Sequence, residues 1–519
     1  MWTPSQLTTI NVLINILGNF ITSDYRSHIE IHENVRVVEN RLANAKSYEF
    51  STYAVEAVKA LAHNRFPENF LFGAATGRIE GDYEFQGRGK SAWNHWTKDK
   101  RDEPACKSLE KHRDDARLVK NLGANSYRIS LSWARIMPDA LSRRVSVEGV
   151  AYYNRRFNDM LSNGIEPIAT LHGLGDVPRE LQPIGGWTNP KMIDHFVNFA
   201  RVAFTAFGDR VKYWISINDP WAVCSSATTT TSNLEQQQQQ LLRLGNYLCG
   251  HHVLLAHAKV YQIYRHEFQK KQNGKIGMSL KVRWFEPHDP ASYKDIEAAE
   301  MSYIFANYWF VNPLLGERGN YHEVMQFKVG MRSATSGLKR SRLPEFTEEE
   351  VRMIRGSLDF LGIDYFQTRE ARYSSSKESD LGAAWLARRK EDIVADAKNF
   401  ERSLERLNAD YILPQLIVTA TGYGDSGGIN DLDRAVYYYE HLSKLLTCLK
   451  SGIDVRGYLA WSLTDSSSTR MNSYSKRNLH YGLYSVDYNN ANCTKTEKSS
   501  AKLIRNIYKT KAMPRLARQ

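Results

Sequence analysis

Short apolar runs alternate with longer segments of helical periodicity through most of this 519-residue chain, and this alternation limits the possible folds more than any other feature. The apolar runs predict strands at residues 126–130, 166–171, 211–217, 276–280, 360–365, 416–419 and 457–462. Helical segments precede the first three of these strands, at residues 113–122, 153–163 and 196–207. Strands separated by helices are typical of βαβ units and a parallel sheet. Seven or eight such units without a linker favour a closed (β/α)8 TIM barrel, an α/β fold, over an open doubly wound sheet.

We expect the barrel to form one large domain, residues 65–510. A prior of about 150 residues per domain would give three or four domains, but barrels often exceed that size as a single domain. Residues 1–64 contain one helix-prone segment and no second core, which indicates an N-terminal extension, and residues 511–519 form a basic tail. The reactive side chains of barrels come from the C-terminal ends of the strands, so we expect the functional site there.

The composition is that of a soluble globular protein, with 42% hydrophobic, 11% aromatic and 24% charged residues. Sixty-nine Lys and Arg against 57 Asp and Glu give a net charge of +12, but acidic residues lie among the basic ones nearly everywhere. A nucleic-acid-binding protein more often concentrates its positive charge in a stripe or patch. We therefore expect a basic solvated surface and no nucleic-acid partner.

The sequence shows no pattern for a metal or a nucleotide cofactor. Its five cysteines are odd in number and far apart, and none of them forms a C-x-x-C pair. No G-x-G-x-x-G follows the first strand, and no G-x-x-x-x-G-K-[ST] occurs. We expect neither a metal site nor a cofactor, and the sequence leaves the oligomeric state open.

The apolar run at residues 10–21 resembles a degraded export signal, since no Lys or Arg precedes it and asparagines interrupt it. It is too short to cross a bilayer, so we expect no transmembrane span. Residues 492–494 form an Asn-Cys-Thr sequon, which matters only in the secretory pathway. The compartment stays open, and these two features favour a secreted product over a cytoplasmic one.

Six sequence blocks identify the kind of protein more specifically than the alternation of predicted strands and helices does. They are RFPENFLFGAAT at 65–76, NSYRISLSWARI at 125–136, GGW at 185–187, FGDRVKYW at 207–214, GHHVLLAHA at 250–258 and YGLYSVD at 481–487. Together they resemble glycoside hydrolase family 1, the group of β-glucosidases, myrosinases and klotho-type proteins, in the family's order from residue 65 to about 510. The resemblance implies a TIM barrel and, for active members, retaining hydrolysis of β-glycosides by two carboxyl groups roughly 5–5.5 Å apart.

Both catalytic carboxyl positions are altered. The resemblance implies an acid/base Glu in a T-x-N-E-P strand end, where Asp219 stands in Ser-Ile-Asn-Asp-Pro. The shorter side chain withdraws the carboxyl by about one C–C bond, ~1.5 Å. The implied nucleophile is the Glu of an I-T-E-N-G strand end, where Ala420 stands. A methyl group cannot form a glycosyl ester, and loss of a covalent nucleophile has cost ~10⁶ in rate in a serine protease.

Asp364 is the nearby carboxylate that could substitute in an inverting reaction, which needs a pair roughly 6.5–9.5 Å apart. Asp364 and Tyr365 match a family strand that brings an Asn and a Tyr to the site. The alternative for Asp364 is a solvated or hydrogen-bonded loop carboxylate. Arg128 corresponds to a family Arg that positions the nucleophile, and a buried guanidinium without a partner is costly. We therefore expect Arg128 to have found another acceptor, an anion or water.

The residues that hold the sugar in the family are also altered. Arg78 stands at the position of a Gln, and Ser468 and Thr469 stand where a Glu and a Trp are expected. His172 lies in a strand-end motif that is one residue longer than the family's, where an ordinary loop histidine is equally consistent. The residues that we expect to line a sugar site are Arg78, His172, Asn218, Asp364, Tyr365, Trp461, Ser468 and Thr469.

The altered catalytic and sugar-holding positions all belong to one pocket of the family, whereas the six family-like sequence blocks are kept. We therefore expect a barrel that is inactive, or nearly so, as a retaining β-glycosidase and that binds a β-glycoside, another glycan or a protein, as klotho-type relatives do. The alternative is a weak or altered β-glucosidase that uses Asp219 with Asp364 or a water. Plant myrosinases lose the acid and keep the nucleophile, which is the opposite of this chain, so we do not expect a thioglucosidase.

Overall fold

The computed structural model describes residues 64–77, 91, 111–141, 144–173, 177–226, 236–374, 383–387, 393–465, 479–490 and 493–514. Almost all of the predicted N-terminal extension, the sequon residue Asn492 and residues 515–519 of the tail lie outside this part of the chain.

Eight parallel strands close into a barrel in the order β1-β11-β10-β7-β5-β4-β3-β2. The strands are β1 (Leu71–Thr76), β2 (Ser126–Ser130), β3 (Glu166–His172), β4 (Tyr213–Asn218), β5 (Lys275–Lys281), β7 (Phe360–Tyr365), β10 (Gln415–Thr421) and β11 (Val455–Trp461). The predicted (β/α)8 barrel is confirmed. The strand β1 is the one that the apolar runs left unassigned, although it lies within the first family-like block.

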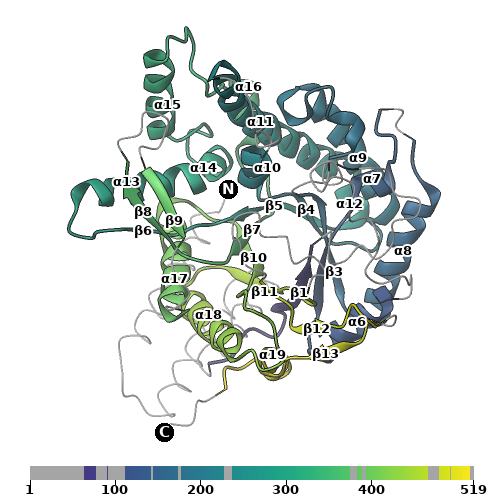
Figure 1. Ribbon diagram of the computed structural model, residues 1–519. Helices are drawn as coiled ribbons and strands as arrows, with labels where there is room; N and C mark the ends of the chain where they lie inside the picture. Colours follow the sequence, from purple (N-terminus) through teal and green to yellow (C-terminus); the bar gives the residue numbers. More distant parts are fainter. Residues whose placement is uncertain are drawn as a thin grey trace, which may run out of the picture.

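Helices surround the barrel, and at least one follows each strand along the chain (Figure 1). The longer ones are α6 (Lys111–Asn121), α8 (Val147–Ser162), α9 (Lys191–Phe207), α11 (Gln236–Ile263), α13 (Tyr293–Tyr303), α15 (Glu323–Thr335), α17 (Ile393–Asp410), α18 (Leu432–Lys450) and α19 (Ser499–Thr510). Short helices are α7 (Trp133–Ile136), α10 (Pro220–Ser226), α12 (Gln269–Gln272), α14 (Trp309–Leu315) and α16 (Glu348–Ile354). Two small sheets lie outside the barrel, formed by β6 (Phe285–Pro287), β8 (Arg369–Tyr373) and β9 (Ala383–Ala387), and by β12 (Tyr484–Val486) and β13 (Lys495–Glu497).

The charge-rich segment 374–405, in which the apolar runs predict no strand, contains most of α17. Phe400, Leu404 and Leu407 of this helix are fully buried. Residues spaced four and three apart lie on one face of a helix, so these three pack together against the barrel. The many charged residues of the segment concealed this apolar face.

The inside of the barrel changes from apolar to polar along its axis. A lower cluster consists of Ile168, Ile215, Phe360, Ile417 and Leu459, with Ala75 beside them, and these side chains are almost completely buried. Successive side chains of a strand point to opposite faces, so the residue two positions beyond each of these lies on the same inner face, nearer the C-terminal end. Thr170 and Thr419, two positions beyond Ile168 and Ile417, are polar residues of the candidate site that lie on this inner face.

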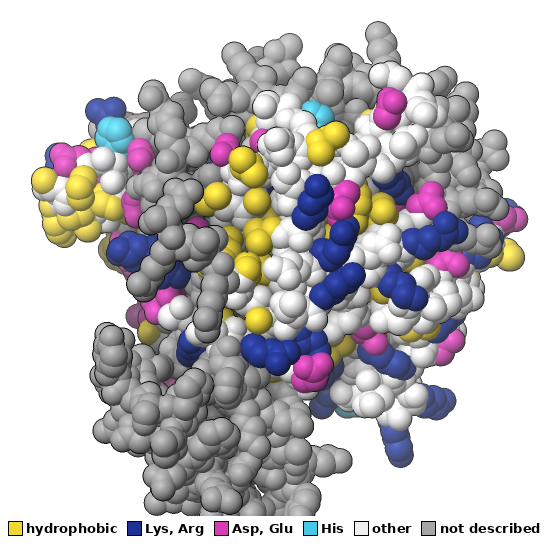
Figure 2. Space-filling model, turned by 90° about the horizontal axis from the view of Figure 1, so that it is seen from below, with side chains coloured by type: hydrophobic (Ala, Val, Ile, Leu, Met, Phe, Trp, Pro, Cys, Tyr) yellow, Lys and Arg dark blue, Asp and Glu magenta, His cyan; other side chains and the backbone are white. Residues whose placement is uncertain are grey.

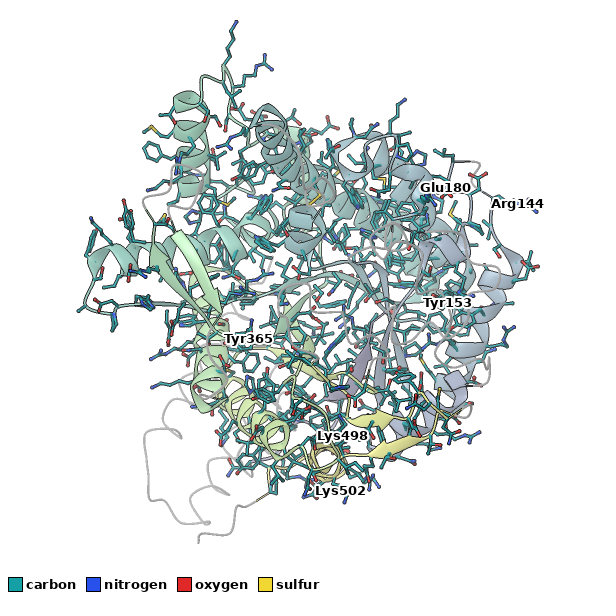
Figure 3. The ribbon with its side chains drawn as sticks, viewed as in Figure 1. Arg144, Tyr153, Glu180, Tyr365, Lys498 and Lys502 are labelled. Atoms are coloured by element: carbon teal, nitrogen blue, oxygen red, sulfur yellow. A yellow bond between two sulfur atoms is a disulfide. The ribbon has the colours of Figure 1, made fainter. Side chains whose placement is uncertain are left out.

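Two buried cations join the C-terminal part of the chain to the barrel. Arg434 of α18 is fully buried and lies 2.7 Å from Asp425 and 2.9 Å from Asp431. Lys498, at the start of α19, is also fully buried, and its Nζ lies 2.8 Å from Oδ2 of Asp465 in the loop after β11 (Figure 3). Each cation pairs with a carboxylate, and these ion pairs hold the loops after β10 and β11 in place.

Charged side chains are spread over the surface. Figure 2 shows Lys and Arg side chains with Asp and Glu side chains between them on the face that it presents. In the part of the chain that the structure describes, no helix combines the length and apolar character needed to cross a membrane.

Candidate active site at the mouth of the barrel

Ala420 lies on β10, where its Cβ faces the inside of the barrel. The pairing of β10 with β7 shifts between Val418 and Ala420, and this irregularity aligns Ala420 with Asp364. Residues in register on parallel strands point to the same side of the sheet. Ala420 is 1% exposed. The position expected for a nucleophile is therefore directed inward, but it presents only a methyl group.

Asp364 holds a buried ion pair with Arg128. The Nη1 atom of Arg128 lies 3.2 Å from Oδ1 of Asp364, and their side chains are 3% and 6% exposed. The hydroxyls of Ser279 and Thr419 lie 3.0 Å and 2.8 Å from the same oxygen. Asp364 is therefore neither a solvated loop carboxylate nor a base with a free Oδ1, because that oxygen already has three neighbouring donors.

Arg128 has no lack of acceptors. Besides Asp364, its guanidinium donates to Oγ1 of Thr170 at 3.0 Å, to the carbonyl of Thr419 at 3.0 Å and to Oδ1 of Asn218 at 2.6 Å. Burial lowers the pKa of Arg128, and the charge of Asp364 opposes this effect. The prediction that Arg128 has found another acceptor is confirmed, and Asn218 is one of its partners.

Asp219 directly follows β4 and adopts the left-handed backbone conformation, with φ of 44°. Its Oδ1 accepts a hydrogen bond from the amide of Ala222, 3.1 Å away, in the first turn of α10. The same oxygen lies 3.7 Å from Nη2 of Arg283, which is 6% exposed, while Asp219 is 14% exposed. Asp219 thus keeps limited access to solvent but serves as the partner of a buried guanidinium. A general acid instead has to present a proton to the substrate.

A hollow of about 10 Å³, roughly the room for one water molecule, lies against Asp219 and Lys281. Trp221, Phe310 and Asn307 contribute to its lining. Ligand pockets usually measure roughly 300–1,000 Å³. The described residues therefore leave space for about one water molecule at this point and do not outline a sugar pocket.

Aromatic rings form a wall at the mouth. Phe366, directly after β7, lies edge-on to Trp461 with ring centroids 6.3 Å apart and edge-on to Tyr481 at 6.2 Å. The three residues are partly exposed. Nζ of Lys281, the last residue of β5, lies 4.9 Å from the centre of the Phe366 ring. This wall presents apolar ring surface at the place where the strand ends meet.

Tyr365 does not belong to this wall, and the prediction that it contacts a ligand is wrong. Its side chain is fully buried, and its ring packs 5.2 Å from Phe400 of α17 and 6.0 Å from His441 of α18. Figure 3 shows it on the side of the barrel that α17 covers. The physical reason is strand alternation, because Asp364 points inward and the next residue must point outward.

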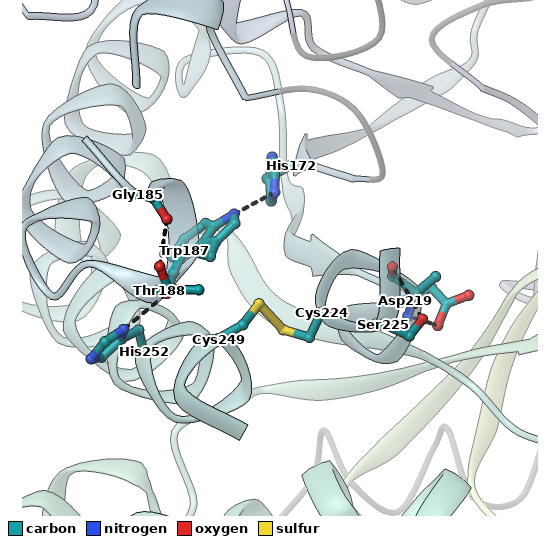
Figure 4. The surroundings of a disulfide bond; sticks show 10 residues. His172, Gly185, Trp187, Thr188, Asp219, Cys224, Ser225, Cys249 and His252 are labelled. Atoms are coloured by element: carbon teal, nitrogen blue, oxygen red, sulfur yellow. Dashed lines mark hydrogen bonds between the residues drawn. A yellow bond between two sulfur atoms is a disulfide. The ribbon is translucent and has the colours of Figure 1, made fainter. Parts of the chain in front are cut away.

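His172 is also removed from the mouth. It is 1% exposed, and its Nε2 accepts a hydrogen bond from the indole of Trp187 at 3.1 Å (Figure 4). The rings of Trp133 and Phe196 pack around it. Aromatic neighbours enclose the ring of His172, so the structure does not place it among the partly exposed residues of the mouth. Arg78, Ser468 and Thr469 lie outside the described residues.

A disulfide lies behind the acid position. Cys224 of α10 and Cys249 of α11 are bonded, and Figure 4 shows the bridge close to Asp219. Cys493 is disulfide-bonded as well, whereas Cys448 is free and buried. Among the described residues, no group of His, Cys, Asp and Glu has an arrangement that could hold a metal ion. The bridge ties the helix that follows Asp219 to the neighbouring helix of the barrel wall.

The model of the family described as Glycosyl hydrolase family 1 matches residues 62–513, more than four fifths of the chain. The chain belongs to glycoside hydrolase family 1. It is 34% identical to Myrosinase 1 of Brevicoryne brassicae over 468 residues, which cover 86% of this chain and 99% of that protein. It is 32% identical to the human cytosolic beta-glucosidase over 468 residues, 85% of this chain and 98% of the relative.

Solved family 1 structures share the fold. The structure of aphid myrosinase superposes with a TM-score of 0.75 at 32% identity, covering 86% of this chain and 99% of that one. The beta-glucosidase from Thermotoga maritima in complex with castanospermine has a TM-score of 0.74 at 27% identity, covering 87% and 100%.

The family 1 pattern connects positions 364 and 420. The resemblance places a Glu at 420 and an Asn at 364, whereas this chain has Ala420 and Asp364. The two positions are aligned on neighbouring strands, and Arg128 pairs with the carboxylate at 364. Among the described residues, the negative charge paired with this arginine is thus carried by β7 instead of β10.

Sequence reasoning missed Lys281, Arg283, Phe366 and the disulfide. Lys281 and Phe366 directly follow the apolar runs predicted as strands at 276–280 and 360–365. The rule that functional side chains come from the C-terminal ends of barrel strands would have identified both. The sequence offered no comparable signal for the disulfide, because its cysteines are 25 residues apart.

Proposed function

We propose that this family 1 protein does not hydrolyse β-glycosides by the retaining mechanism and that it binds a glycan at the mouth of its barrel. The observation that carries the proposal is the inward-facing Ala420. Retaining hydrolysis requires a carboxylate that attacks the anomeric carbon. Ala420 provides no attacking oxygen, and the neighbouring carboxylate of Asp364 is buried against Arg128.

The remaining carboxylate supports the same conclusion. Asp219 is paired with Arg283 and accepts the amide of Ala222. A weak glycosidase that uses Asp219 as its acid would have to release it from Arg283. An inverting reaction would also need a base, and Oδ1 of Asp364 is occupied by Arg128, Ser279 and Thr419. These contacts favour binding over turnover.

The aromatic wall supports glycan binding over a purely structural role. Trp461, Phe366 and Tyr481 remain partly exposed at the mouth. Binding sites combine apolar and aromatic walls with a few polar groups that fix orientation. Here the polar groups are Asp219, Lys281 and the Arg128 network. A purely structural role would not require partly exposed aromatic rings and charged groups together at the strand ends.

Hydrolysis assays test the loss of turnover. Purified protein is incubated with fluorogenic β-glucosides, β-galactosides and β-fucosides and with a β-thioglucoside, because one relative is a myrosinase. We expect no rate above that of the Asp219→Asn variant. Turnover that this substitution abolishes, or a mechanism-based fluorosugar that labels the chain in mass spectrometry, would refute the proposal.

Calorimetry tests the binding. Alkyl β-glycosides are titrated into wild-type protein and into Trp461→Ala and Trp461→Phe. We expect heat of binding for the wild type, its loss in Trp461→Ala and its partial retention in Trp461→Phe, which keeps an aromatic ring. A panel that gives no heat above dilution would leave only a protein-binding or structural role.

We also propose that the protein matures in the secretory pathway. Disulfides persist in oxidising compartments and are rare in the cytosol. The bridge between Cys224 and Cys249 supports such a compartment. Expression in a secreting cell should give a product whose mass falls on endoglycosidase treatment through the sequon at Asn492. An unglycosylated product retained in the cytosol with free thiols would contradict this proposal.

A further inference from the structure

Lys281 lies at the mouth of the barrel, and no described residue forms an ion pair with it. It is the last residue of β5 and is partly exposed. In the part of the chain that the structure describes, its Nζ faces the ring of Phe366 and forms neither an ion pair nor a hydrogen bond. A lysine at a strand end, where a barrel keeps its functional groups, is therefore available to a ligand.

The two neighbouring carboxylates are already assigned to arginines. Asp219 pairs with Arg283, and Asp364 pairs with Arg128. With these two pairs neutralised, the charge of Lys281 is in excess.

The protonation of Lys281 responds to this setting. Burial lowers its pKa, the charges of Asp219 and Asp364 oppose this effect, and those of Arg283 and Arg369 add to it. An anion placed beside Nζ would favour the charged form.

We propose that Lys281 forms an anionic subsite beside the aromatic wall, and that the ligand is an acidic saccharide whose carboxylate or sulfate group pairs with its Nζ. The inference rests on the proposed glycan-binding function and specifies the class of glycan. The sugar ring lies against Phe366 and Trp461, and the acidic substituent reaches the end of β5. Neutral glycosides lack the group that matches Lys281.

Calorimetry with matched sugars tests the subsite. Methyl β-D-glucoside, methyl β-D-glucuronide and methyl β-D-glucoside 6-sulfate share one ring and differ in charge, and the two acidic sugars distinguish a carboxylate from a sulfate. We expect at least one acidic sugar to bind the wild-type protein ten times more tightly than the neutral one at low salt. The preference should shrink as salt is raised, because added ions screen the charge of a partly exposed lysine.

Three variants identify the residue responsible. Lys281→Met should remove the preference for the acidic sugar, and Lys281→Arg, which keeps the charge, should retain most of it. The matched control is Lys275→Met, on the same strand but at its opposite end, where Nζ bonds to Gln415 at 2.6 Å. This control should keep the full preference.

The outcomes separate the two proposals. Equal affinity for neutral and acidic sugars, or equal loss of the preference in Lys275→Met and Lys281→Met, overturns the anionic subsite and leaves glycan binding in place. No binding of any of the three sugars overturns both. If Lys281→Met does not fold, the affinity ratio and salt dependence of the wild-type protein still decide whether the site is anionic.

Discussion

Moving the carboxylate from position 364 to position 420 should show that either position can supply the negative charge that pairs with Arg128. Arg128 faces Asp364, and Ala420 is aligned with Asp364 on the neighbouring strand. Asp364→Asn removes the only carboxylate paired with Arg128 among the described residues, and Ala420→Glu adds a second one. The double variant has one carboxylate and one guanidinium again, in the arrangement that the family pattern implies.

The magnitudes follow from burial. The side chains of Arg128 and Asp364 are 3% and 6% exposed, and breaking a buried pair costs about 3–5 kcal/mol. Ala420→Glu leaves one buried carboxylate without a cation and adds about 1–3 kcal/mol for overpacking. In the double variant only the overpacking cost should remain. Independent substitutions would add to within about 0.5 kcal/mol, so we expect a favourable coupling of at least about 3 kcal/mol.

Urea unfolding of the four proteins measures this coupling. Ala420→Gln, alone and with Asp364→Asn, is the control for size, because Gln fills the same space as Glu without its charge. The coupling should be large for Glu and near zero for Gln. Additive effects of Ala420→Glu and Asp364→Asn, or equal coupling for Glu and Gln, would refute the shared charge.

The other predictions concern stability at three sites away from the mouth. Arg434→Met should lower the free energy of unfolding by about 3–5 kcal/mol, because it leaves buried carboxylates unpaired. The control Arg318→Met, at an exposed ion pair, should change it by less than about 1 kcal/mol. Similar urea midpoints for the two variants would contradict this prediction. Burial lowers the pKa of His257 to about 4, so between about pH 6.5 and 4 the unfolded chain binds a proton that the folded protein does not. The free energy of unfolding should therefore fall by up to about 1.4 kcal/mol per pH unit from this group as the pH is lowered through that range. A His257→Gln variant should show a shallower decline between pH 6.5 and 4.5, and parallel curves would count against it. Replacing Cys224 and Cys249 by Ser should cost about 3–4 kcal/mol, because their bridge closes a 25-residue loop, and an unchanged unfolding midpoint would show that the bridge contributes nothing.

Local sequence patterns were sufficient to predict the barrel. The strand predicted at 360–365 coincides with β7, and that at 126–130 with β2. Both runs are apolar because barrel strands are covered by helices on one side and by the core on the other. The α17 helix was missed because its large buried apolar side chains are embedded among many charges, so its apolar face becomes evident only when the helix is placed against the barrel.

For the site, the sequence by itself determined that an attacking carboxylate is missing at Ala420 and that Asp219 is shortened, since side-chain identity at an aligned position is a covalent property. Only the tertiary structure decided that Asp364 belongs to Arg128, that Tyr365 and His172 are enclosed by aromatic rings, and that Lys281 has no carboxylate partner among the described residues. Those outcomes depend on which way a strand residue points and on which charges, hundreds of residues apart, come within a few ångströms of one another. Ion pairing and burial are properties of that three-dimensional proximity, and no local pattern along the chain encodes them.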